Sequence, residues 1–95
     1  MQKDDIIAEA VKIIREYISK DDKVVLFGSW ARGDALETSD IDIGILGESA
    51  VPLDNMIRIS GKIKSIPTLR KIDVVDLNAK EKGFKDSVLS YGKFL

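Results

Sequence analysis

The sequence predicts an α/β (α+β) fold, in which a small mixed β-sheet has helices packed on one face. Two long segments carry apolar residues at helical spacing, and three shorter segments have the composition of strands. The order helix, strand, helix, strand, helix, strand, helix describes such a sheet. With 95 residues, 44% of them hydrophobic, the chain can build one core, so we expect a single domain over 1–95.

The chain begins with a predicted helix over about 4–19, which is followed by a strand over 24–27. The helix has an apolar stripe with spacings of four and three residues, formed by Ile7, Val11, Ile14 and Ile18. After a polar turn, the strand Val24-Val25-Leu26-Phe27 is apolar on both faces and ends at Gly28. A strand that is apolar on both faces is typical of the centre of a sheet.

The segment after this strand is the first candidate binding element. Ser29 to Arg32 predicts a short helix, whose first-turn N–H groups lack intrahelical acceptors. Glycine at position 28 lets the backbone approach phosphate oxygens, and the Ser29 hydroxyl can donate a hydrogen bond to them. Taken alone, Gly28 and Ser29 also fit an ordinary strand-ending turn. Two interpretations of Arg32 stay open: contact with phosphates, or an ion pair with Asp34 or Glu37 that shapes the loop.

The second strand, over 41–45, carries two candidate metal ligands. Isoleucine occupies every other position, and Asp40 and Asp42 lie on the opposite face, so one face joins the core and the other carries both carboxylates. Carboxylates this close repel, and a divalent cation removes the conflict. All-oxygen ligands favour Mg²⁺ over Zn²⁺. Strand aspartates can also simply face solvent, but the preceding Gly28-Ser29 turn makes that interpretation the weaker one.

The remainder of the chain predicts three more elements. A helix over 53–66 ends before a proline, and its Gly61 costs about 1 kcal/mol relative to alanine, so this helix needs tertiary support. A third strand follows over 71–77. A final helix over 84–91 runs into a glycine, and we expect Phe94 and Leu95 to pack back onto the fold.

The third strand supplies a further carboxylate. Asp73 shares a face with Val75 and Leu77, and its neighbours have the composition of buried residues. A carboxylate in such a place is either an expensive buried charge or a metal ligand. Asp76 competes for this role, but by alternation it lies on the opposite face. We therefore assign Asp76 to solvent or to a structural contact, and Asp73 to the site.

The composition excludes several classes of chemistry. Cysteine and histidine are both absent, which removes the thiol nucleophile, the disulfide, the usual zinc ligands and the usual general base. With 15 basic and 16 acidic residues the net charge is -1, so the chain has no broad basic surface and binding of nucleic acid is disfavoured. No apolar run has signal or membrane length, and we expect a cytoplasmic protein without membrane contact.

Two aromatic residues near these motifs are interpreted as packing residues. Trp30 could stack on a base or on a partner protein, but a lone tryptophan beside a core strand more often packs against it. Tyr91, at the end of the final predicted helix, is assigned to the core in the same way.

Together these motifs resemble one known family. Ten residues separate Gly28-Ser29 from the pair Asp40-x-Asp42, and the full pattern consists of Gly28-Ser29-x-x-Arg32-Gly33 and Ser39-Asp40-Ile41-Asp42. This pattern resembles the minimal nucleotidyltransferases, the smallest branch of the DNA polymerase beta superfamily. The resemblance covers nearly the whole chain, because the later elements follow in the order of that family. Asp73 falls where the family has its third carboxylate.

The resemblance implies a polymerase-beta-like fold and a specific reaction. An acceptor hydroxyl attacks the α-phosphorus of a nucleoside triphosphate, and a nucleoside monophosphate is transferred. Asp40, Asp42 and Asp73 would hold two Mg²⁺ ions and form the catalytic set, with Asp73 on the nucleophile side. Gly28 and Ser29 would bind the triphosphate, and Arg32 is included among the nucleotide-binding residues. ATP is the donor that the resemblance implies.

The resemblance also implies a partner. Minimal nucleotidyltransferases of this size are commonly found beside a small helical HEPN protein as antitoxin and toxin, and some transfer AMP to a tyrosine of that partner. We therefore expect a protein adenylyltransferase antitoxin. The alternatives are an antitoxin that only binds its partner, and transfer to a small molecule or an RNA end. Association of identical chains is left open.

Overall fold

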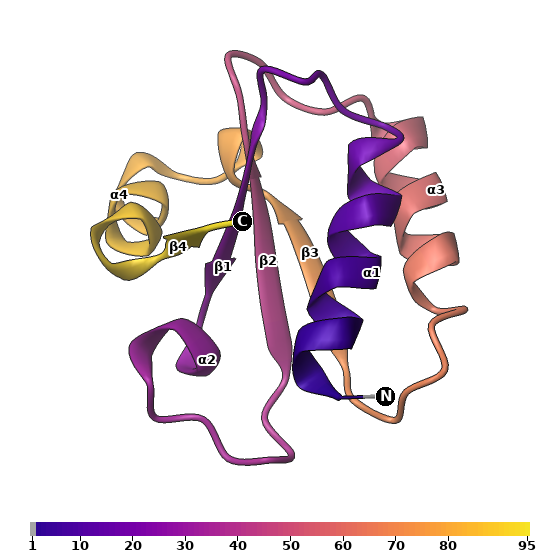
Figure 1. Cartoon of the computed structure of the whole chain (residues 1–95). Helices are drawn as coiled ribbons and strands as arrows, with labels where there is room; N and C mark the ends of the chain where they lie inside the picture. The colour runs from indigo at the N-terminus through magenta and orange to yellow at the C-terminus, as the bar shows by residue number, and fades with distance from the viewer. Residues whose placement is uncertain (1) are drawn as a thin grey trace.

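The computed structural model describes residues 2–95 and contains one four-stranded sheet with the strand order β3-β2-β1-β4 (Figure 1). The elements in chain order are α1 (Lys3–Arg15), β1 (Lys23–Phe27), α2 (Ser29–Arg32), β2 (Ile41–Leu46), α3 (Leu53–Ile63), β3 (Ile72–Asp76), the 3₁₀-helix η1 (Leu77–Ala79), α4 (Lys82–Tyr91) and β4 (Lys93–Phe94). β1 runs antiparallel to β2 and β4, whereas β2 and β3 are parallel. The mixed sheet of the predicted α/β class is thereby confirmed.

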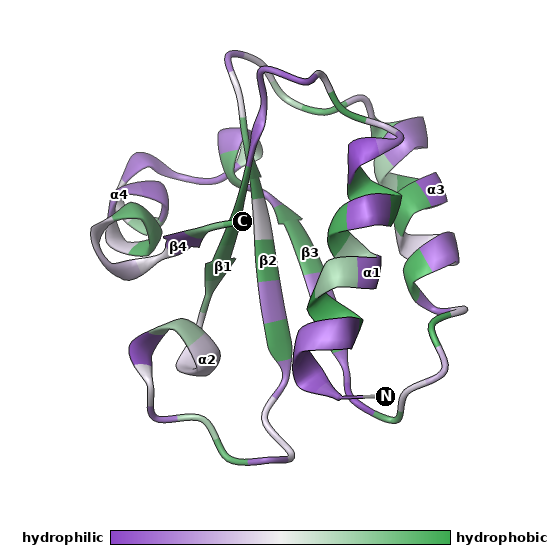
Figure 2. Ribbon diagram, in the orientation of Figure 1, coloured by the Kyte–Doolittle hydropathy of each residue, from purple (hydrophilic) through white to green (hydrophobic). Residues whose placement is uncertain are grey.

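The larger core layer lies between the sheet and the helices α1 and α3 (Figure 1). Its largest fully buried side chains come from α1, β1, β2 and α3: Ile6, Ile14, Val24, Ile41, Ile43, Ile45 and Ile59. The three isoleucines of β2 reach this layer together because strand side chains alternate between faces. Complete burial of one such side chain contributes about 1.5–3 kcal/mol. Figure 2 shows hydrophobic bands on α1 and α3 alternating with hydrophilic ones.

A second, smaller core layer covers the other face of the sheet. There Val25 and Phe27 of β1 pack with Leu77 and with Val88 of α4. We expected helices on one face; α1 and α3 follow this expectation, but α4 lies on the opposite side of the sheet (Figure 1). The physical reason is that β1 is apolar on both faces, so each face needs a cover.

The predicted element ends differ from the observed ones by a few residues. The first helix ends at Arg15 and not at 19, because the next N–H groups bond in tighter turns, Glu16 N–H to Ile13 O and Tyr17 N–H to Ile14 O. The third helix likewise ends at Ile63 and not at 66.

The end of the chain adds a strand that the sequence did not predict. Lys93 and Phe94 form β4, and the Leu95 N–H donates to Val24 O at 2.8 Å. The backbone returns to the sheet, but the expected packing of Phe94 and Leu95 is wrong, because both side chains stay exposed. A strand of two residues is too short to show alternation in the sequence.

Asp76 has the structural contact that the alternation predicted. Its side chain is buried and accepts hydrogen bonds from Val51 N–H at 2.7 Å and Asn78 N–H at 3.0 Å. These bonds attach the loop before α3 to the end of β3. None of the helices in residues 2–95 combines the length and the apolar character needed to cross a membrane.

Candidate active site

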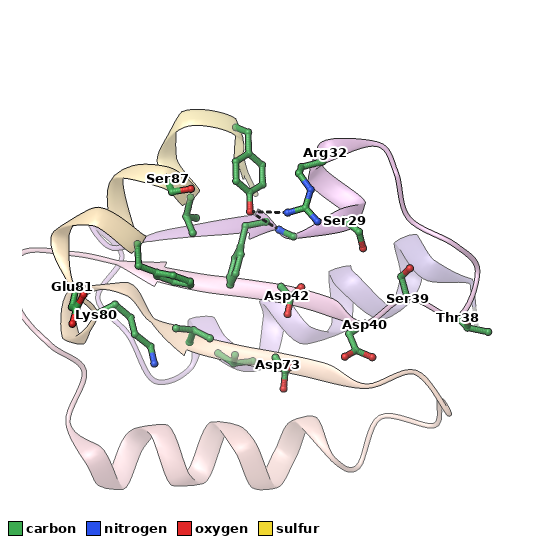
Figure 3. A pocket seen from close by; sticks show the side chains of 17 residues that line it. Ser29, Arg32, Thr38, Ser39, Asp40, Asp42, Asp73, Lys80, Glu81 and Ser87 are labelled. Carbon is green, nitrogen blue, oxygen red and sulfur yellow. Dashed lines mark hydrogen bonds between the residues drawn. The ribbon is translucent and has the colours of Figure 1, made fainter.

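A pocket of about 1110 Å³ opens on the α4 side of the sheet (Figure 3). Its wall includes every residue that the sequence analysis selected: Gly28, Ser29, Arg32, Asp40, Asp42 and Asp73. These residues come from the turn after β1, from α2, from β2 and its approach, and from β3. The fold therefore brings together side chains that are up to 45 positions apart in the sequence.

The three aspartates lie next to one another through the pairing of the strands. Asp42 of β2 is directly opposite Asp73 of β3 in the parallel register, and Phe27 is its partner on β1. Neighbouring strands are about 4.8 Å apart, so Asp42 and Asp73 are close neighbours. Asp40 precedes β2 and is two residues from Asp42, on the same face.

The electrostatics of the site centre on Asp42. Burial raises the pKa of its carboxyl group most, and the negative charges of Asp73 and then Asp40 raise the pKa further. Arg32 and Lys71 act in the opposite direction but do not outweigh these causes. The ionised form of Asp42 is therefore less favourable in the folded protein than in the unfolded chain, and a cation placed between the carboxylates would remove this cost.

The residues fit Mg²⁺ by their chemistry. Their donors are carboxylate oxygens, the ligands of a hard cation, and Asp42 gains from a positive charge nearby. Within residues 2–95, no three acidic side chains are gathered closely enough to form a ready metal centre. Mg²⁺ typically uses only one or two carboxylates, and it completes its shell with water and substrate phosphate oxygens.

The turn that carries Gly28 packs against the Asp42 carboxylate. Gly28 has φ +71° and ψ -159°, a conformation that is open almost exclusively to glycine. A Cβ atom at this position would collide with Oδ2 of Asp42. Gly28 O accepts from the N–H groups of Ala31 and Arg32, both at 3.1 Å, and so begins α2. The glycine therefore allows the turn and the carboxylate to occupy neighbouring space.

Tyr91 is a site residue that the sequence analysis assigned only to packing. Its hydroxyl accepts a hydrogen bond from Gly28 N–H at 3.1 Å, and Arg32 Nη1 lies 3.5 Å from the same oxygen (Figure 3). The ring does pack against both core layers, which agrees with the predicted packing. No local pattern could reveal the hydroxyl contact, because Tyr91 and Gly28 are 63 residues apart.

Arg32 makes one of the two contacts that the sequence left open, the ion pair with Asp34. Its guanidinium group lies 3.5 Å from the Asp34 carboxylate in an exposed pair, and 5.6 Å from the centre of the Tyr91 ring. It also lines the pocket and faces the charge of Asp42. The exposed pair with Asp34 contributes little to stability.

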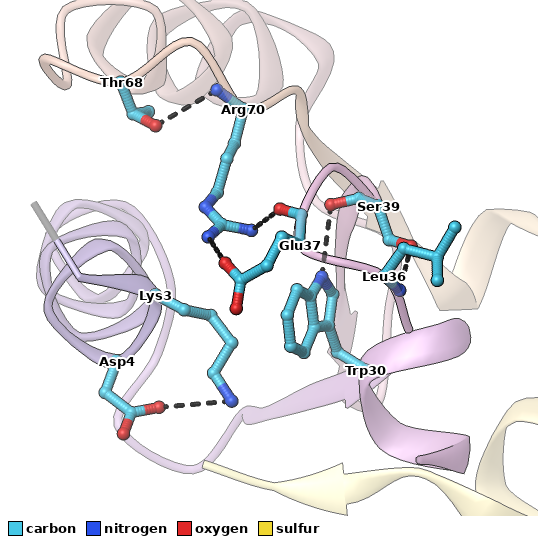
Figure 4. Close-up of polar contacts among 8 residues, drawn as sticks. All are labelled: Lys3, Asp4, Trp30, Leu36, Glu37, Ser39, Thr68 and Arg70. Carbon is cyan, nitrogen blue, oxygen red and sulfur yellow. Dashed lines mark hydrogen bonds and ion pairs between the residues drawn. The ribbon is translucent and has the colours of Figure 1, made fainter. Parts of the chain in front are cut away.

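Trp30 fixes the loop that leads to Asp40 (Figure 4). The indole N–H donates to Ser39 O at 3.1 Å, and Lys3 and Arg70 lie 4.6 and 5.4 Å from the ring centre. Arg70 in turn pairs with Glu37 of the same loop at 3.0 Å. The packing interpretation of Trp30 therefore agrees with the structure, and its contacts show how the approach to β2 is positioned.

Comparisons with known proteins agree with this geometry. The family model for "Polymerase beta, Nucleotidyltransferase" matches residues 10–95. Over 86 residues the chain is 35% identical to the protein adenylyltransferase MntA of Shewanella oneidensis, a match that covers 90% of this chain and 60% of MntA. The chain thus spans about three fifths of the length of that relative.

Solved structures give the same result for the fold. A crystal structure of a toxin–antitoxin with AMP-PNP matches with a TM-score of 0.74 and 27% identity, over 98% of this chain and 72% of the other. An AMPylated HEPN toxin from Shewanella oneidensis in complex with its MNT antitoxin matches with a TM-score of 0.72 over 98% and 71%, and at 24% identity it supports the fold alone. Because the family model spans the whole pocket, the chain belongs to the polymerase beta nucleotidyltransferase family.

Proposed function

We propose that this protein is a Mg²⁺-dependent adenylyltransferase that transfers AMP from ATP to a tyrosine hydroxyl of a HEPN-family toxin, and that it acts as the antitoxin of that pair. One observation carries the proposal: the Gly28-Ser29 turn and the three aspartates share one pocket. Membership of the nucleotidyltransferase family supports the reaction class. The relative named as a protein adenylyltransferase supports a protein acceptor and an adenylyl donor.

The proposed reaction forms one bond to phosphorus and breaks another. The acceptor oxygen forms a bond to the α-phosphorus, the bond from that phosphorus to the bridging oxygen breaks, and pyrophosphate leaves. Bound Mg²⁺ supplies positive charge for the attacking and leaving oxygens. The Asp73 side chain lies 3.8 Å from Lys71 and is 38% exposed, so an incoming hydroxyl can reach it. Asp73 orients this hydroxyl and accepts its proton. Ser29 and Arg32 retain the pyrophosphate.

A protein partner fits the shape of this molecule. The pocket opens to solvent, and residues 2–95 form the sheet, its two core layers and no separate acceptor-binding unit. An acceptor held by another chain can therefore approach Asp73 directly. The similar toxin–antitoxin structure supports a toxin as this other chain. The HEPN identity of the toxin rests on the family resemblance.

The test is incubation with labelled ATP and Mg²⁺, with and without the product of the neighbouring gene, followed by intact mass of both proteins. We expect one or more AMP units on the partner. Asp42→Asn should lose the transfer, because it removes a carboxylate from the metal site and keeps the side-chain volume. The matched control is Asp21→Asn, which changes an exposed aspartate outside the pocket and should retain full activity.

A second candidate is an antitoxin that blocks its partner by binding alone. In the same experiment this candidate predicts a tight complex without any change of mass, and an unchanged complex for Asp42→Asn.

A further inference from the structure

The pocket has two ends of different chemistry. Ser29, Arg32 and Ser39 give the end near the Gly28 turn a polar lining. The other end lies under α4, where Phe27, Val75, Phe84 and Val88 form an apolar wall with Lys80 and Glu81 beyond it. In Figure 3, Lys80 and Glu81 are at the far end of the pocket from Ser39 and Asp40. A nucleotide also has a polar and an apolar end, so the lining sets the direction in which it can bind.

Phe84 is the most unusual residue of the apolar end. It is 43% exposed, although a phenylalanine side chain gains free energy by burial. Its ring meets the ring of Phe27 edge-on, with centroids 6.1 Å apart and planes at 90°. This contact fixes the orientation of Phe84 from one side and leaves ring surface open to the pocket.

The spacing along α4 gives the distance of Phe84 from the Gly28 turn. Phe84 and Tyr91 are seven residues apart, which is two helical turns, so they lie on one helix face about 10 Å apart. Tyr91 touches Gly28 and Arg32 at the polar end. On the sheet below, Val75 follows Asp73 by two residues and continues the same face. A nucleoside whose phosphates lie at the turn therefore reaches Phe84.

We propose that the apolar end of the pocket is a nucleobase subsite in which the base stacks on Phe84. This proposal rests on the proposed nucleotidyl transfer and deepens it, because it names the group that distinguishes a nucleotide from free triphosphate. A stacking platform accepts any base, and it favours a purine because of the larger ring face. The carboxylates then lie beneath the α-phosphate, between the base and the leaving group.

The experiment compares Mg²⁺-ATP with Mg²⁺-tripolyphosphate by isothermal titration calorimetry. Phe84→Leu keeps an apolar side chain against Phe27 but removes the aromatic face. We expect this variant to bind Mg²⁺-ATP about 5- to 100-fold more weakly and to bind tripolyphosphate as the wild type does. Phe84→Tyr should restore ATP binding. Phe94→Leu, which changes an exposed phenylalanine outside the pocket, is the matched control and should leave both affinities unchanged.

Two results would overturn the base subsite. One is an unchanged affinity of Phe84→Leu for ATP, and the other is an equal loss for ATP and tripolyphosphate, which would make Phe84 a packing residue only. The proposed subsite and the proposed reaction can be refuted independently of each other. If ATP binding depends on Phe84 but no AMP is transferred to any protein, the proposed reaction is wrong and the subsite stands.

Discussion

Asp42 has a charge that opposes folding. Because burial and the neighbouring carboxylates raise its pKa in the folded protein, the native state binds protons that the unfolded chain has already released. The contribution of Asp42 to stability therefore falls as pH rises. This penalty is absent below the ordinary aspartate value of 3.8 and complete above the raised pKa of the folded state.

Asp42→Asn should consequently be more stable than the wild type at neutral pH in buffer without divalent cations. We expect a rise of a few degrees in Tm at pH 7, and no rise at a pH below the ordinary aspartate value. Thermal unfolding of both proteins across this range isolates Asp42, because all other carboxylates are common to both. A variant that is less stable than the wild type at pH 7 would contradict the raised pKa. A stabilised variant without activity would show that the site trades stability for function.

Gly28 and Gly33 offer a matched pair for testing the turn after β1. Both have positive φ angles, +71° and +88°, but only Gly28 lies against the Asp42 carboxylate, and a Cβ at Gly33 would meet no atom within 4 Å. Gly33→Ala should cost about 1 kcal/mol for the left-handed backbone. Gly28→Ala should cost about 3 kcal/mol and also displace the carboxylate. Urea unfolding measures the stability cost, and an assay of AMP transfer measures the effect of the displaced carboxylate. Equal losses of stability and activity at the two positions would refute the close packing of Gly28 against Asp42.

Helix α4 is attached to the turn at Gly28 through the Tyr91 hydroxyl. Tyr91→Phe keeps the ring in both core layers but leaves the Gly28 N–H without its acceptor. We expect a loss of about 1 kcal/mol in the free energy of unfolding. We also expect a higher KM for ATP, because the turn that we propose to bind the triphosphate is less firmly held.

The control for this prediction is Tyr17→Phe, since Tyr17 lies outside the pocket and is the other of the two tyrosines. It should leave the KM for ATP unchanged. If both variants change KM equally, or neither does, Tyr91 has only a packing function.

The type of each larger element could be predicted from sequence, because its apolar period is local. The alternating isoleucines of β2 specify a strand and place Asp40 and Asp42 on one face, and the same alternation separates Asp73 from Asp76. Residues that act through the tertiary structure could not be predicted in this way. The contact of Tyr91 with Gly28, the open face of Phe84 and the two-residue strand β4 depend on how α4 crosses the second face of the sheet.

The whole protein should respond to its nucleotide with a large gain in stability. A domain of 95 residues has a small core and a marginal free energy of unfolding, so binding energy is a large fraction of its stability. ATP alone brings negative charge to a pocket that already holds three aspartates, and Mg²⁺ alone lacks the phosphate oxygens that complete its shell. When both bind, Mg²⁺ offsets the negative charge of ATP, and ATP supplies the phosphate oxygens that Mg²⁺ lacks.

At a ligand concentration of about 100 times Kd, the gain in the free energy of unfolding is about 2.7 kcal/mol, which corresponds to a rise in Tm on the order of 10 °C. Differential scanning fluorimetry with ATP, Mg²⁺, both, and both with Asp42→Asn measures this coupling. Equal shifts with ATP alone and with Mg²⁺-ATP would refute a carboxylate metal site, because the aspartates would then contribute nothing to nucleotide binding through a cation.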